Sequence, residues 1–312
     1  MDVPADGLQF RLKDRSGVEL GDAVTVELGH DGEQPKVFRG TVVALRPAIV
    51  GVEIRALGTM NALLNYRMAA LYENQSVGSI ANDLISQSGL SAGTVDSGPT
   101  LPRFAINSQS SAFVHLKGLA DRIGCELYAN RDGDIMFHAL GKAANAGAGG
   151  LLGAAGGLSA AGGSEEYVFG KHLLDASVER QPAIWDMIET GSESPVSGQG
   201  QTTTHWLTTN DADYKGSAGS GARRLLVFDA AARTKDLADN FAAGRLAVAE
   251  RRAHEILLMV LGRPSVDLGD SITTSEVPDS LINGSGYVRA ICHRFDTDKG
   301  FLTDLRIGLG AT

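Results

Sequence analysis

The stretch Val266-Asp267-Leu268-Gly269-Asp270-Ser271-Ile272-Thr273 decides the fold, because its pattern also occurs near the start as Val18-Glu19-Leu20-Gly21-Asp22-Ala23-Val24-Thr25. Two further pairs of blocks follow in the same order. They are Gly40-Thr41-Val42-Val43-Ala44-Leu45 with Gly286-Tyr287-Val288-Arg289-Ala290-Ile291, and Glu53-Ile54-Arg55-Ala56 with Asp304-Leu305-Arg306-Ile307. Leu-Gly-Asp alone is a common turn into a strand. Three blocks in matching order predict two related β domains.

Both copies alternate apolar and polar residues, as strands with one buried face do. Val24 and Val26 share one face in the first copy, and Leu305 and Ile307 share one face in the second. The aligned apolar positions therefore agree in direction as well as in identity. The sequence thus predicts strands at both ends of the chain.

The segment between the two copies has helical spacing. Ser76 is a plausible N-cap for one amphipathic helix, which Gly89 ends. A second helix begins at Ser110 or Ser111 and stops at Gly124. Strand-like sequence on both sides of an Asp-Gly turn then predicts a hairpin, so this middle segment is expected to be a compact α/β insert.

Residues 141–163 are nearly all Gly and Ala. Gly149, Gly153 and Gly157 are spaced by four, as in packed membrane helices, so one interpretation is a segment that meets a membrane or packs against copies of itself. The other interpretation is a flexible loop, because glycine costs about 1 kcal/mol per residue in a helix and the segment has few large apolar groups. We therefore expect a linker without membrane contact.

The remaining residues return to strand-like pieces. Residues 191–221 are rich in Gly, Ser and Thr and are predicted to form long loops. A last helix is expected from Thr234, and Ile256 begins the strand that leads into the second Leu-Gly-Asp block. The fold class predicted from these patterns is α+β, mainly β.

The composition is that of a globular chain, with 43% apolar and 21% charged residues. Its net charge of −9 argues against nucleic-acid binding, because phosphate binding needs a basic face. Cys125 and Cys292 lie far apart in apolar sequence, so both are predicted to be buried free thiols in a reducing compartment. Residues 1–6 have neither a basic run nor an apolar core, so we expect no signal peptide.

The sequence offers few residues for chemistry. No two histidines lie within five residues of each other and the cysteines form no close pair, so there is no local zinc pattern. No Gly-x-Ser-x-Gly elbow occurs, although a Ser/His/Asp triad built from distant loops stays open. The glycine run at 147–153 is not followed by a βα unit, as a dinucleotide fingerprint would require. The basic doublets are expected to be solvated or salt-bridged; they are Arg223-Arg224 and Arg251-Arg252.

Three Asp-x-Asp pairs could bind calcium or act as acid and base; they are Asp132/Asp134, Asp211/Asp213 and Asp296/Asp298. The first and last lie in Gly-containing turns, where Asp is favoured because it bonds to the local backbone. The sequence therefore predicts no catalytic, cofactor-binding or metal-binding residue.

The order of motifs resembles the phage late control protein D family, the baseplate hub proteins of contractile tails, and is similar to the hub portion of the type VI secretion spike protein. The resemblance extends from about Leu20 to Leu309. The motifs that carry it are Val52 to Gly58, Tyr72 to Ile80, Phe113 to Phe137, Leu261 to Asp270, Gly286 to His293 and Gly300 to Thr303.

This resemblance implies a homotrimer with two tube-like β-barrel domains per chain. Three chains would form a pseudo-sixfold ring that joins a hexameric tail tube to a trimeric spike, beside other baseplate proteins. It also implies assembly in the bacterial cytoplasm and residence in a virion or injection particle. The expected domains are a first β-barrel domain (1–58), an inserted α/β domain (59–140), a linker (141–165) and a second β-barrel domain with one helix (166–312).

The chain departs from the family in two places. Only Leu8 to Leu12 precedes the first Leu-Gly-Asp block, so the first barrel is expected to be incomplete or closed by a neighbouring chain. The segment 141–163 is not a family feature and is open to a lumen plug, a partner contact or a disordered loop. We expect no fused spike or lysozyme-like domain after Leu309. The alternative function is a tail-associated hydrolase with its site on the loops of residues 191–221.

Overall fold

The computed structural model describes residues 1, 3–13, 17–30, 32–140, 165–191, 215–251 and 253–309. Its helices are α1 (Asn61–Asn65), α2 (Val77–Gln87), α3 (Ala112–Ile123) and α5 (Lys235–Arg251). Its strands are β1 (Gly7–Leu12), β2 (Ala23–Glu27), β3 (Lys36–Pro47), β4 (Val52–Gly58), β5 (Ala70–Ser76), β6 (Ala92–Val95), β7 (Thr100–Ile106), β8 (Glu126–Ala129), β9 (Ile135–His138), β10 (Glu165–Val168), β11 (Leu173–Arg180), β12 (Met187–Gly191), β13 (Lys215–Gly219), β14 (Arg224–Phe228), β15 (His254–Leu261), β16 (Ser271–Ser275), β17 (Gly284–Asp296) and β18 (Gly300–Leu309). The fold is α+β and mainly β, as predicted.

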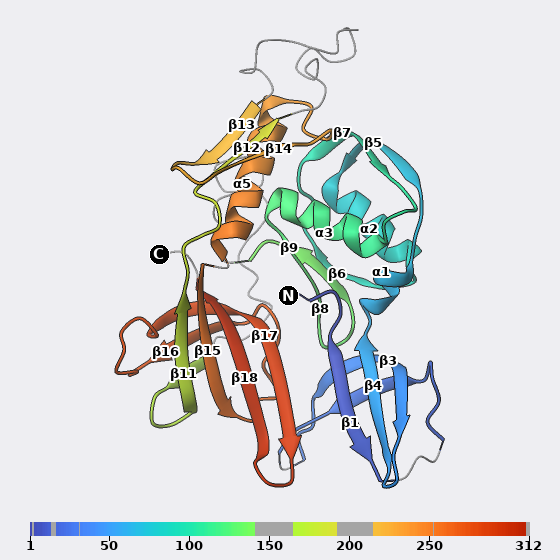
Figure 1. Cartoon of the computed structure of the whole chain (residues 1–312), viewed down its shortest axis with the longest axis vertical. Helices are drawn as coiled ribbons and strands as arrows, with labels where there is room; N and C mark the ends of the chain where they lie inside the picture. Colours follow the sequence, from blue (N-terminus) through green and yellow to red (C-terminus); the bar gives the residue numbers. More distant parts are fainter. Residues whose placement is uncertain are drawn as a thin grey trace.

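The two copies of the sequence repeat form sheets with the same strand order. The N-terminal sheet has the order β1-β4-β3-β2, and the C-terminal sheet contains β15-β18-β17-β16 in the equivalent order, flanked by β11 and β10. Figure 1 shows the two sheets side by side, with the helices above them. The predicted repeat is therefore confirmed in its topology.

The Leu-Gly-Asp turn has the same geometry in both copies. Gly21 and Gly269 have φ values of 93° and 90°, a conformation that favours glycine. Each glycine N–H donates to a strand carbonyl at 2.9 Å, Gly21 to Val42 and Gly269 to Val288. The turn therefore fixes the start of β2 and β16 against the same point of β3 and β17.

A β-bulge also occurs at the same point of both copies. The register shifts between Val42 and Ala44 and again between Val288 and Ala290. One extra residue is left unpaired in each strand, Val43 in the first and Arg289 in the second. A bulge bends its strand and re-aims the extra side chain.

The C-terminal sheet is strongly curved, like part of a barrel. The chain from Val168 to Leu173 links the two outermost strands, β10 and β11, and can reach at most ~18 Å. Six flat strands would place those edges ~24 Å apart, so the sheet must curve to bring them together. The enclosed core consists of Tyr167, Leu173, Ile256, Leu258, Val260, Val266, Ile272, Val277, Ile282, Val288, Leu305 and Ile307.

The N-terminal sheet is smaller and open. Among the described residues it consists of four strands that end at β1 and β2, without counterparts of β10 and β11. Its core cluster has Val42, Val52 and Ile54 as buried residues, with Phe10 and Val24 partly buried against them. That the first barrel is incomplete or closed by a neighbouring chain stays a prediction, with which this open sheet is compatible.

The predicted helices and hairpin between the sheets are confirmed. Ser76 caps α2, because its hydroxyl oxygen accepts a hydrogen bond from the Ser79 N–H at 3.1 Å. Gly89 follows α2 with φ 75°, and Gly124 ends α3 in the left-handed conformation with φ 74°. Strands β8 and β9 pair as the expected hairpin. The sequence did not indicate the pairing of β5 with β7.

Helix α5 packs on the inserted unit. It follows Thr234, whose hydroxyl oxygen accepts a hydrogen bond from the Leu237 N–H at 3.2 Å, as the predicted start requires. Phe241 on α5 is fully buried in the same core as Leu116 and Leu119 of α3. The core of the inserted unit therefore includes part of a helix assigned by sequence to the second β domain, and the exact domain bounds stay a prediction.

One part of the predicted loops is a strand. Residues 215–219 form β13, which pairs with β12, so the loop prediction is wrong there. Its glycine content explains the error: a Cβ at Gly216 would lie 2.1 Å from the backbone of Ala238, so the glycine lets α5 approach the strand. The segment 141–163 and most of the loops 191–221, including Asp211 and Asp213, lie outside the described residues.

The two cysteines differ in burial. Cys125 is buried as predicted, but Cys292 is exposed, which corrects the expectation of two buried thiols. After the bulge in β17, Ile291 packs toward the core, so its neighbour Cys292 points to the outer face, where it pairs with Asp304. In the described part of the chain, no helix is long and apolar enough to cross a membrane.

Candidate functional site at the β8–β9 hairpin

The turn between β8 and β9 contacts both repeat sheets. Arg131 donates through Nε to Asp267 Oδ2 at 2.9 Å, and Asp267 precedes the Leu-Gly-Asp turn of the C-terminal sheet. On the other side, Asp132 Oδ1 accepts from Lys36 Nζ at 2.7 Å, and its carbonyl oxygen accepts from Arg39 at 3.2 Å. Lys36 and Arg39 belong to β3 of the N-terminal sheet. One turn therefore holds the two sheets in a fixed relation.

Asn130 fixes the backbone conformation of the turn that makes these contacts. Its side-chain oxygen accepts from the backbone N–H groups of Asp132 and Asp134 at 3.0 and 2.9 Å. Gly133 takes φ 87°, and its carbonyl oxygen accepts from the Thr59 hydroxyl at 2.9 Å. The backbone bonding expected of the first Asp-x-Asp pair is thus made by Asn130. This leaves the Asp132 carboxylate free to bind Lys36.

The last Asp-x-Asp pair has the predicted turn role. Asp296 accepts hydrogen bonds from the backbone N–H groups of Asp298 and Lys299 at 2.8 and 2.6 Å. These bonds lower the pKa of Asp296, because they favour its charged form. Hydrogen bonding to Lys36 likewise holds the pKa of Asp132 below its ordinary value.

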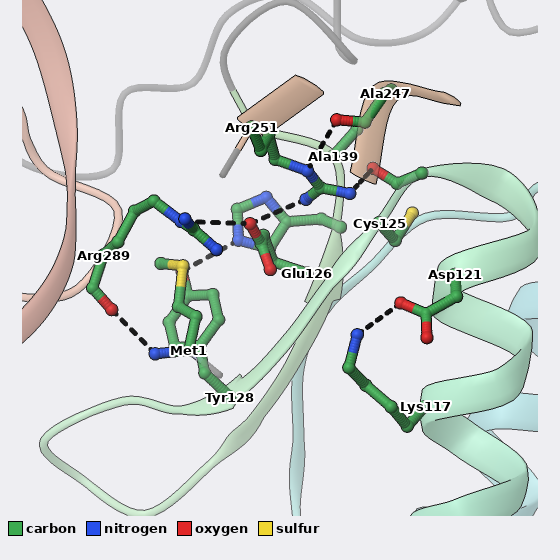
Figure 2. Close-up of polar contacts among 12 residues, drawn as sticks. Met1, Lys117, Asp121, Cys125, Glu126, Tyr128, Ala139, Ala247, Arg251 and Arg289 are labelled. Atoms are coloured by element: carbon green, nitrogen blue, oxygen red, sulfur yellow. Dashed lines mark hydrogen bonds and ion pairs between the residues drawn. The ribbon is translucent and has the colours of Figure 1, made fainter. Parts of the chain in front are cut away.

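Above the turn, the inserted unit is anchored to the C-terminal sheet by buried charges (Figure 2). Glu126 at the start of β8 is 3% exposed and lies 2.6 Å from Nη1 of Arg251 on α5. Arg289 approaches the same carboxylate at 3.7 Å and pairs with Glu255 on β15 at 2.7 Å. The carbonyl oxygen of Arg289 accepts from the Met1 amino group at 2.7 Å. Three parts of the chain therefore meet at one charge cluster.

Arg289 reaches this cluster because of its position in the repeat. It is the extra residue of the β17 bulge, and a Cβ on Gly308 of the paired strand would lie 2.6 Å from its side chain. In the N-terminal sheet the counterparts are Val43, which is 40% exposed, and Leu57. The same backbone therefore carries a charged anchor in one copy and an apolar surface residue in the other.

An aromatic contact completes the anchor. Tyr128 packs in one small cluster with Tyr287, and its hydroxyl lies 2.9 Å from His138 Nε2. Burial raises the pKa of Tyr128 and lowers that of His138. A Cβ on Gly269 would lie 2.9 Å from the Tyr128 hydroxyl, so the turn glycine also makes room for the inserted unit.

A second buried carboxylate joins α3 to α5. Asp229 is 5% exposed, pairs with Arg122 at 2.7 Å and also binds Arg245. Burial alone would raise the pKa of Asp229, but the two arginines outweigh it and hold the pKa below its ordinary value. This pairing fixes the helices above the sheets.

These ion pairs hold the inserted unit, its helices and the C-terminal sheet in place. The strongly buried carboxylates described above are paired with arginines that come from other elements of the fold. Within the described ranges, no group of three or more His, Cys, Asp and Glu side chains is placed to hold a metal ion. Sequence patterns do not indicate these anchors, because the pairs Glu126–Arg251, Arg122–Asp229 and Arg131–Asp267 each join residues more than 100 positions apart. A local signal is the pair of opposite charges in the turn Asn130-Arg131-Asp132-Gly133.

The chain has the fold of phage tail proteins, as its resemblance predicts. It is similar to the 43 kDa tail protein of prophage MuSo2 from Shewanella oneidensis, with 15% identity, a TM-score of 0.64, and coverage of 96% of this chain and 88% of that chain. A tail protein from Neisseria meningitidis MC58 gives 14% identity and a TM-score of 0.66, covering 99% of this chain and 89% of that one.

The chain is also similar in structure to a protein of a secretion system. It is a component of the type VI secretion system of E. coli that is itself structurally similar to the T4 bacteriophage tail proteins gp27 and gp5 (11% identity, TM-score 0.54, coverage 98% and 69%). No family model matches the chain. No curated protein matches it.

Proposed function

We propose that this chain is a structural baseplate hub of a contractile tail or contractile injection system. The observation that carries the proposal is the repeat: two sheets with one strand order, one turn geometry and one bulge position in a single chain. Three such chains supply six matching sheets, enough for a pseudo-sixfold ring. The fold that the chain shares with phage tail proteins supports the same role.

In this proposal the ring joins a hexameric tail tube on one side to a trimeric spike on the other, beside other baseplate proteins. The particle is a virion or an injection device assembled in the cytoplasm. The β8–β9 turn sets the angle between the two sheets of a chain, because Arg131 and Asp132 hold one sheet each. The domain bounds 1–58, 59–140, 141–165 and 166–312 belong to this proposal.

The proposed role is not enzymatic. The strongly buried charges of the described residues join elements of the fold, which is the task of a scaffold. The alternative, a hydrolase on the loops 191–221, draws no support from residues 215–221, because β13 packs there against α5. We therefore keep the hub as the function.

Electron microscopy of the purified protein in negative stain tests the proposal. Class averages should show rings with a central channel and three- or pseudo-sixfold symmetry. Light scattering on the same sample should give a mass near three times 32.7 kDa. Single compact particles with the mass of one chain, at every concentration tried, would contradict the hub.

A further inference from the structure

The two repeats of one chain touch through a loop. The loop 28–35 joins β2 to β3, and its His30 lies with Nε2 3.3 Å from the carbonyl oxygen of Gly262, just past β15. The ring of His30 also lies 5.7 Å from that of Phe301 at the start of β18. The contact therefore joins the β2–β3 loop of the first copy to the β15 end and β18 start of the second.

Each half of this contact has a counterpart elsewhere in the chain. The loop 276–283 joins β16 to β17, as 28–35 joins β2 to β3. Val42 pairs with Ala56 and Val288 pairs with Ile307, so Ala56 corresponds to Ile307. Counting six residues back from each, Val50 in the turn before β4 corresponds to Phe301 in β18. The β1 end and β4 start are thus the counterpart of the surface on which His30 rests.

These counterparts lie far apart in the described part of the chain, and each exposes at least one apolar side chain. Leu281 in the loop is 48% exposed. At the other counterpart Val50 is 70% exposed, Ile49 is fully exposed, and Leu12 at the end of β1 is 37% exposed. Figure 1 shows β16 on one side of the molecule and β3 with β4 on the opposite side. Such an arrangement suits a head-to-tail contact between copies.

The charges of the two surfaces are complementary. The loop carries exposed Glu276 and Asp279, whereas the other surface has exposed Arg11, Lys13 and Arg46 beside its apolar residues. A chain with a net charge of −9 repels its copies on average, so contact is favoured where opposite charges face each other.

We propose that the loop 276–283 of one copy docks on the surface formed by Leu12, Ile49 and Val50 of the next copy, repeating between chains the contact that His30 makes within a chain. Three such contacts close a ring. The proposal rests on the hub function and names the residues through which the ring forms. In this ring, the apolar end of the N-terminal sheet at Leu12, Ile49 and Val50 would be covered by a neighbouring copy.

Light scattering after size exclusion tests this contact on the full chain at low salt. Leu281→Asp and Val50→Asp should each shift the mass from about three chains to one, because a charge would enter an apolar contact. Ile184→Asp is the matched control: Ile184 is 62% exposed but lies outside both surfaces, so the trimer should persist. Far-UV circular dichroism confirms that each variant is folded.

A charge exchange makes the test specific. Glu276→Lys and Lys13→Glu should each weaken the trimer at least tenfold, and the two together in one chain should restore it. Asp279 is left unchanged, because its carboxylate accepts from the Leu281 N–H at 2.9 Å and shapes the loop. If the mass stays at three chains in all of these variants, the proposed contact is wrong, whereas the proposed hub function is unaffected. A wild-type chain that is always monomeric overturns both.

Discussion

Arg131 and Asp132 are adjacent in one turn and bind opposite repeats, Arg131 through Asp267 at 2.9 Å and Asp132 through Lys36 at 2.7 Å. One peptide bond therefore separates the residue that binds the C-terminal sheet from the residue that binds the N-terminal sheet. Together with the contact of His30 with Gly262, these two ion pairs join the sheets.

The two ion pairs should differ in their contribution to stability. Arg131 and Asp267 are about a quarter exposed, whereas Asp132 is 58% exposed. Asp132→Ala should lower the free energy of unfolding by less than about 1 kcal/mol, as for surface pairs, and Arg131→Ala by about 1–2 kcal/mol. Urea unfolding measures both. Equal effects would mean that burial does not strengthen the Arg131 contact.

Removal of the Arg289 side chain should be severe. Arg289→Ala leaves the buried Glu126 and the partly buried Glu255 without one partner each, so we expect a loss of about 3–5 kcal/mol in the free energy of unfolding. The control is Arg294→Ala on the same strand, an exposed residue paired with Asp304, which should cost at most about 1 kcal/mol. Similar losses in both variants would refute the anchoring role of Arg289.

The two turn glycines provide a matched pair. Gly21→Ala and Gly269→Ala both place a side chain in the left-handed region, at about 1–2 kcal/mol each. Only at Gly269 would the new Cβ also meet Tyr128, at 2.9 Å; at Gly21 it would find open space among the described residues. Thermal unfolding should therefore show the larger loss for Gly269→Ala. Truncation of Tyr128 to Leu in the same chain should remove the excess, and an unchanged excess would exclude this clash as its cause.

The Asp229 cluster should make stability pH-dependent. The pKa of Asp229 is lowered in the folded chain, so its contribution is present above the unfolded pKa of about 3.9 and is lost as the pH falls through the folded value. Asp229→Asn should therefore cost about 3–5 kcal/mol near neutral pH and progressively less below about pH 4. Urea unfolding from neutral pH to pH 3 measures this difference. A constant difference would show that the charge of Asp229 is not what matters.

Thiol labelling distinguishes the two cysteines. Cys292 is exposed beside Leu257 and Met259 on the outer face of the C-terminal sheet, so it should react with Ellman's reagent in the native protein. Cys125 is buried, and burial raises the pKa of its thiol well above the ordinary value, so it should react only after denaturation. Cys292→Ser should abolish the native signal. Two reactive thiols in the native chain would contradict the described burial.

Local signals in the sequence predicted much of the fold. Ser76 and Gly124 mark helix ends through capping chemistry that acts within a few residues, and the Leu-Gly-Asp turns mark strand starts in the same way. Burial of Cys292 was predicted incorrectly, because a bulge three residues earlier moved it to the outer face. A bulge depends on the partner strand, so a single strand does not reveal it.

The candidate site could not be predicted from the sequence, because it is formed by contacts between residues that are distant in the chain. Arg289 and Val43 occupy the same place in the repeat, yet nothing in their neighbourhood in the chain shows that one is buried under β8 and the other is exposed. Gly216 was counted as a loop residue because of its type, although its lack of a side chain is what lets α5 pack on β13. In both cases a distant element decided the role of the residue.

The two bulges carry different residues, Arg289 and Val43, so the two matching sheets are not equivalent. Because Arg289 approaches the buried Glu126 of the inserted unit and the exposed Val43 does not, the buried charge anchor of that unit lies at one of the two matching bulges. A ring of six such sheets would keep sixfold regularity in its strands while placing this buried anchor on alternate sheets. One buried side chain per chain, at a position where the backbone is the same in both copies, would thereby add a threefold pattern to a sixfold arrangement.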